Sequence, residues 1–136
     1  MSLALEIKEF RVKHPDLVTY LMEGKTVALT GYPEGNYSTE LDDLDLNDSA
    51  ELDLRSLIHE LEDIEALTVD AGNFETNYRL NDRGKKLLLL DDSTLDNLHR
   101  THEEAFAQFL KLCGQEDRAF AQAVNIWRAA VSNILD

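Results

Sequence analysis

Four side chains in the last third of the sequence have the chemistry of a metal site. Asp96, His99, His102 and Glu103 fall at helical spacing, so they could gather on one face of a helix. Histidine and carboxylate groups bind zinc and other transition metals. The four residues lack a defining motif such as His-Glu-x-x-His and come from one helix, which favours an ordinary solvated face. We therefore predict no metal and no cofactor, and keep a metal-dependent or ligand-sensing role for His99 and His102 as an alternative.

The sequence carries no motif for covalent catalysis, and we predict that the protein is not an enzyme. Cys113 is the only cysteine, which rules out an internal disulfide, and it lies on the apolar side of a predicted helix as a small hydrophobe would. Gly31 and Gly35 match neither phosphate-binding glycine pattern. The lone cysteine, the early charge at Glu6 and the lack of an apolar run of roughly 20 residues predict a cytoplasmic protein.

Negative charge is concentrated in one third of the chain. The net charge is -14, from 27 acidic and 13 basic residues, and residues 39–70 hold twelve of the acidic residues against Arg55 alone. One interpretation is a solubilising surface or a host with an acidic proteome. The other is a surface shaped to meet a basic partner.

The 136 residues predict a single domain, mainly α with a small β component. The central stretch has a helix over residues 48–65, with an apolar stripe at spacings of four and three. Residues 67–69 and 74–80 follow with the period of half-buried strands, and a further helix begins at Asn81 or Asp82. Before this stretch we expect short helices at residues 3–10, 17–23 and 40–45, a strand at 25–30 and a turn at 31–36. After it, residues 93–136 predict an antiparallel helical hairpin.

This order of elements resembles a winged helix-turn-helix domain of the MarR-like and PadR-like transcription regulators. Residues 40–44 resemble the first helix of the turn motif, and residues 49–61 resemble the recognition helix. Tyr78, Leu80, Gly84 and Leu87 stand where those families have the segment that ends the wing, with Asn81 in the usual place of threonine. The sequence has Glu65-Ala66 where the families usually have a glycine. The resemblance implies a winged-helix-like core at about 17–90 and a homodimer formed by the C-terminal helices.

The charges of the predicted recognition helix oppose DNA binding, because carboxylates are repelled by phosphates. Our first hypothesis is a non-catalytic regulatory protein whose acidic face binds a basic protein partner, with DNA mimicry as one version. Its binding residues would be Glu51, Asp53, Glu60, Glu62 and Asp63. The alternative is a dimeric DNA-binding transcriptional regulator. Its contacts would come from Arg55, His59, Arg79, Arg83, Lys85 and Lys86.

Overall fold

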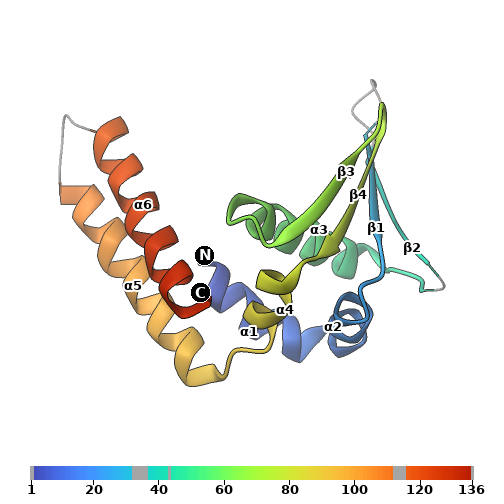
Figure 1. The fold of residues 1–136 in the computed structure, drawn as a ribbon, viewed down its shortest axis with the longest axis horizontal. Coiled ribbons are helices and arrows are strands. Elements are labelled where there is room, and N and C mark those ends of the chain that lie inside the picture. The colour runs from blue at the N-terminus through green and yellow to red at the C-terminus, as the bar shows by residue number, and fades with distance from the viewer. Residues whose placement is uncertain (1, 32–36, 43, 112–115, 136) are drawn as a thin grey trace. The chain divides into compact units, whose positions relative to one another are not determined.

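The computed structural model describes residues 2–31, 37–42, 44–111 and 116–135, and the side chains of Tyr37 and of residues 108–121 lie outside this description. The described residues form six helices and one antiparallel sheet (Figure 1), so the prediction of a mainly helical protein with a small β component is confirmed. The elements are α1 (Leu3–Lys13), α2 (Pro15–Met22), β1 (Val27–Gly31), β2 (Tyr37–Leu41), α3 (Asp48–Asp63), β3 (Leu67–Ala71), β4 (Glu75–Leu80), α4 (Asp82–Leu88), α5 (Asp92–Lys111) and α6 (Glu116–Leu135).

The chain divides into two compact units. One unit is Glu9–Leu88, and it contains the sheet with α3 and α4. The other joins the start of the chain, up to Lys8, to everything from Leu89 onward. In this second unit α5 and α6 pack along each other as the predicted hairpin, with Leu98 of α5 and Trp127 of α6 among the buried residues. Phe109, Leu112, Cys113 and Phe120 lie outside the described side chains.

The sheet has the strand order β2-β1-β4-β3 and two different faces. The helix-side face carries Val27, Leu67, Tyr78 and Leu80, which are all buried. Helix α3 supplies the other half of this core. Its fully buried side chains are Leu54, Leu57, Ile58 and Leu61. Alternation puts the neighbouring residues of every strand on the opposite face, which we call the far face.

The predicted helix at residues 40–45 is wrong. Tyr37–Leu41 is strand β2, which pairs with β1 in a register that sets Leu41 opposite Val27 and Thr39 opposite Leu29. A helix here would bury only Leu41 and Leu44, whereas the strand extends a sheet and satisfies its backbone hydrogen bonds. A β-hairpin strand therefore stands where the resemblance implied the first helix of a turn motif. The predicted turn at 31–36 lies almost wholly outside the described residues.

The end of α3 is joined tightly to the β3–β4 ribbon and to α4. Glu65 adopts the left-handed conformation, with φ 60°. The Ala66 N–H donates to the Leu61 carbonyl at 2.9 Å and the Glu65 N–H donates to the Glu62 carbonyl at 3.0 Å. These are the two bonds of a Schellman motif, whose left-handed residue is usually glycine. The helix thus ends with a glutamate in the place where the resembled families usually have glycine.

Asn81 and Gly84, at the start of α4, contact the backbone carbonyls of the same turn. The Asn81 N–H donates to the Ala66 carbonyl at 3.2 Å, and its side-chain amide donates to the Glu65 carbonyl at 2.9 Å. The Asn81 side-chain oxygen also accepts the Gly84 N–H at 3.0 Å, which caps α4 as predicted. A Cβ at Gly84 would lie 2.3 Å from the Ala66 carbonyl oxygen, so this close approach requires glycine.

Replacing Glu65 with glycine should stabilise the fold. A residue with a Cβ in the left-handed conformation costs roughly 1–2 kcal/mol, so Glu65→Gly should raise the free energy of unfolding by about 1 kcal/mol. Glu65→Ala is the matched control, because it removes the carboxylate and keeps the Cβ. Denaturant unfolding of the three proteins measures the difference. An equal gain in Glu65→Ala would assign the effect to charge at the helix C-terminus instead.

Candidate interaction surface

Helix α3 shows one side to solvent along its whole length. The Asn47 side chain caps it by accepting the Ala50 N–H at 2.8 Å. Its apolar stripe packs onto the sheet, so the opposite side is open. The acidic residues predicted to bind a partner are distributed around this open side.

The five predicted acidic residues do not lie on one line. At about 100° per residue, Glu51 and Glu62 fall on one flank of α3, and Asp53 and Glu60 fall on the other. Asp63 lies on the outward ridge between the flanks, and it is exposed. The carboxylates therefore lie on both flanks of the solvent-facing side of α3.

The flank nearer the sheet is held by polar contacts. The Arg55 Nε donates to the Thr39 hydroxyl at 2.7 Å and lies 3.7 Å from a carboxylate oxygen of Glu51. The Glu62 carboxylate faces the Tyr78 hydroxyl; burial, and then this negative charge, raises the pKa of Tyr78. Arg55 therefore points back to strand β2 and helps to seat α3 on the sheet.

The other flank is tied to α2. The His14 Nε2 lies 2.7 Å from a carboxylate oxygen of Asp53, and His14 is the residue at the N-terminal cap of α2. A shallow surface pocket of about 160 Å³ lies beside this pair, lined by residues of the α2 start and of the segment before α3. Asp53 thus contributes to the packing of α3 as well as to its surface charge.

The outward ridge contains an apolar side chain that our sequence analysis missed. Leu52 is 69% exposed, next to the exposed residues Asp48, Ser56 and His59. The signal was present in the sequence, because Leu52 falls off the apolar stripe of α3. Leu52 is the large apolar side chain that α3 leaves exposed, and it gives this helix an apolar contact point between the two flanks of carboxylates.

The cations predicted for DNA binding are spread over different surfaces. Arg55 and His59 belong to α3, on the helix-side face of the sheet, whereas alternation puts the exposed Arg79 side chain on the far face. Arg83 and Lys85 are half-buried on α4, and Lys86 is exposed there. The structure therefore separates the cation of the wing from those of the helix.

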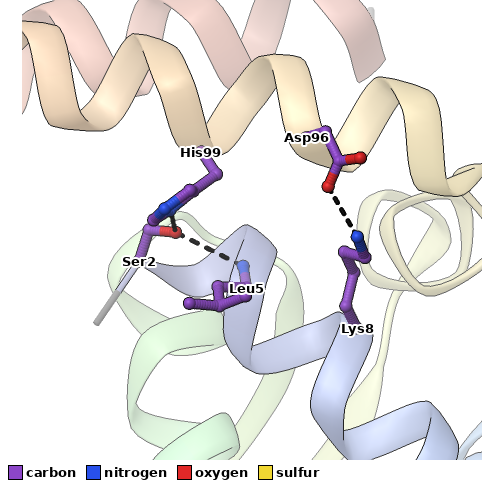
Figure 2. Close-up of polar contacts among 5 residues, drawn as sticks. All are labelled: Ser2, Leu5, Lys8, Asp96 and His99. Carbon is purple, nitrogen blue, oxygen red and sulfur yellow. Dashed lines mark hydrogen bonds and ion pairs between the residues drawn. The ribbon is translucent and has the colours of Figure 1, made fainter.

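The four residues considered as a metal site also have different partners, and Figure 2 shows those of Asp96 and His99. The Asp96 carboxylate pairs with Lys8 at 2.6 Å. The Nδ1 of His99 lies 2.6 Å from the Ser2 hydroxyl. The Nε2 of the same ring lies 3.1 Å from a Glu103 carboxylate oxygen. Both ring nitrogens of His99 are thus engaged. Among the described residues, no three histidine, cysteine or carboxylate side chains are placed to hold a metal ion.

The series Ser2, His99 and Glu103 has the order of a hydrolase triad, but its setting is structural. Ser2 is 1% exposed, and its hydroxyl accepts the Leu5 N–H at 3.3 Å at the start of α1 (Figure 2). A nucleophile must reach its substrate, and a buried helix-capping hydroxyl does not. The contacts fasten α1 to α5.

His102 belongs to an aromatic cluster. Its ring centroid is 4.4 Å from that of Phe106 and 5.2 Å from that of Trp127, which it meets edge-on. Burial lowers the pKa of His102, because the charged ring would lose its hydration among these side chains.

Comparison with known proteins does not identify this chain: no protein-family model, curated protein or solved structure matches it. None of the described helices is both long enough and apolar enough to span a bilayer.

Acidification should weaken the fold through His102. Because its pKa is lower in the folded protein, the unfolded chain binds the proton more readily below the ordinary histidine pKa of about 6.5. The stability that neutral His102 contributes is complete above this pH and is lost as the pH falls toward the folded-state pKa. His102→Gln should reduce the loss in denaturant unfolding, whereas His59→Gln, which leaves His102 in place, should not. Identical pH profiles for wild type and His102→Gln would contradict this assignment.

Proposed function

We propose that this chain is a non-catalytic binding protein whose helix α3 receives a basic segment of a partner protein. The single observation that supports this best is the exposed side of α3, where Leu52 is 69% exposed between two rows of carboxylates. A partner segment with lysine or arginine on both sides of an apolar residue complements this surface. The apolar contact would supply affinity and the charges would select the partner and speed encounter.

DNA binding is less well supported than protein binding. DNA affinity comes mainly from cations that displace counterions from phosphates, and α3 carries six carboxylates and one arginine. That arginine, Arg55, is directed to Thr39. The ribbon β3–β4 after α3 is the observation that keeps a DNA-binding regulator as the second candidate, because a ribbon in this position is what a winged-helix protein uses as its wing.

Neutralising the end of the acidic helix should weaken binding of a basic peptide. With a lysine-rich peptide as probe, Glu60→Gln with Asp63→Asn should lower the affinity by about two- to tenfold at low salt, since exposed charge pairs contribute roughly 0.2–1 kcal/mol each. Glu9→Gln with Glu104→Gln is the matched control, because it removes two exposed carboxylates elsewhere. Leu52→Ser should weaken binding at all salt concentrations. Tight binding of a DNA duplex that is lost in Arg79→Ala and Arg83→Ala would instead support the DNA-binding regulator.

A homodimer through the C-terminal helices is a further part of this proposal. Helix α6 leaves Ile126 47% exposed and Ile134 41% exposed, and residues 118–135 contain no acidic residue. Although the chain has a net charge of -14, two copies that met along residues 118–135 would not bring carboxylates of this stretch together. Sedimentation should show a dimer that Ile126→Lys weakens and Asn125→Lys, with the same added charge at an exposed neighbour, largely retains. A monomer at all concentrations would contradict the dimer without affecting the proposed partner surface.

A further inference from the structure

Strand β3 is an exposed edge of the sheet. It is the outermost strand on its side in the order β2-β1-β4-β3 (Figure 1), and four of its five residues are exposed. Within the described part of the chain, its only strand partner is β4. The other edge of β3 is therefore available for pairing.

The backbone groups that face outward along β3 can be assigned from the hairpin. The Gly72 N–H donates to the Glu75 carbonyl at 2.7 Å, which makes these two residues a hydrogen-bonded pair. In an antiparallel ladder such pairs alternate, so Asp70 and Thr68 also direct their N–H and C=O groups to β4. The N–H and C=O groups of Leu67, Val69 and Ala71 consequently point away from the sheet.

Strand β3 lacks three features that commonly block pairing at a sheet edge, namely a bulge, a proline and a lysine. The register runs without a bulge from Leu67 opposite Leu80 to Ala71 opposite Thr76. The strand contains no proline and no lysine, which natural proteins commonly place on edge strands. A regular, unblocked edge is the template that strand-addition complexes use.

The side chains around the edge define what could pair with it. On the helix-side face, Val69 is 43% exposed, and at the tip of the ribbon Phe74 is 62% exposed. On the far face, the exposed carboxylates are those of Asp70 in β3 and Glu75 in β4, with Arg79 as the neighbouring cation. An added strand could alternate apolar and basic side chains. Its apolar side chains would then cover Val69 on the helix-side face, and its basic side chains would meet the carboxylates on the far face.

We propose that an extended basic segment of the partner protein adds to the sheet along β3 as a fifth strand. This inference rests on the proposed function, because it gives the same basic partner its binding conformation and a second point of attachment. Backbone pairing with the exposed residues Val69 and Ala71 would supply affinity, and Asp70 and Glu75 would select for positive charge.

A second copy of this chain fits the edge poorly. Antiparallel pairing of two β3 strands about Val69 would bring Asp70 of each copy beside Thr68 of the other, and would bring two molecules of net charge -14 together at this edge. Like charges at close range oppose such pairing. Charge therefore favours a basic segment over self-association at β3.

The test uses a synthetic peptide of alternating lysine and valine, with a peptide of alternating glutamate and valine as control. Val69→Pro removes an N–H that points away from β4, so the ladder within the protein should remain intact while the added strand loses a bond and meets the proline ring. The basic peptide should bind about tenfold more weakly to this variant. Val69→Ala keeps the N–H and controls for loss of the side chain, and it should lose much less affinity.

Amide hydrogen exchange of the wild-type protein gives a second readout, which does not depend on the proline variant folding. The basic peptide should slow exchange of the Val69 and Ala71 amides, whereas the Thr68 and Asp70 amides should be protected with or without it. Binding that responds to Glu60→Gln with Asp63→Asn but leaves the Val69 and Ala71 amides unprotected would overturn strand addition and leave the proposed function standing. Equal binding of the acidic peptide, or protection that grows with protein concentration alone, would also overturn it.

Discussion

The Glu65–Ala66 turn is the constraint on which the rest of the larger unit depends. Its two carbonyls are the acceptors for the backbone and the side chain of Asn81, and Gly84 approaches the second of them too closely for any other residue. Helix α3, the β3–β4 ribbon and helix α4 are therefore fixed to one another within a few residues. A left-handed glutamate at this point shows that the geometry of the turn prevails over the local preference of the side chain.

Fixing α3 in this way determines which of its residues can meet a partner. The apolar stripe is committed to the sheet, and Arg55 and Asp53 are drawn into contacts with Thr39 and His14. The residues that face solvent include Leu52, Glu62 and Asp63 on α3, together with outward-facing backbone groups on β3. The two proposed binding features thus follow from one packing arrangement, and both favour a basic protein segment over nucleic acid.

The sequence predicts those elements whose pattern is local. The stripe of α3 and the alternation of β4 have clear periods, and both elements are present where expected. At residues 40–45 the prediction of a helix rests on the spacing of Leu41 and Leu44 alone, whereas Leu41 belongs to a strand because it pairs with Val27 of the preceding strand. The Arg55 side chain points to Thr39, which belongs to β2, so the pattern of α3 alone does not predict its direction. Leu52 could have been found from its place off the apolar stripe of α3, whereas the edge position of β3 required the three-dimensional arrangement.

The excess of negative charge has a physical consequence for the open edge of β3. An unblocked edge strand invites pairing with copies of itself, and most proteins prevent this with lysine, proline or a bulge placed on the strand. Here none of these is present, but every copy carries a net charge of -14, with twelve of its carboxylates between residues 39 and 70. Repulsion between copies can therefore prevent self-pairing without a blocking residue on the strand. The same negative charge attracts a basic segment. The same charge that discourages self-pairing would therefore direct the edge toward the partner that α3 also favours.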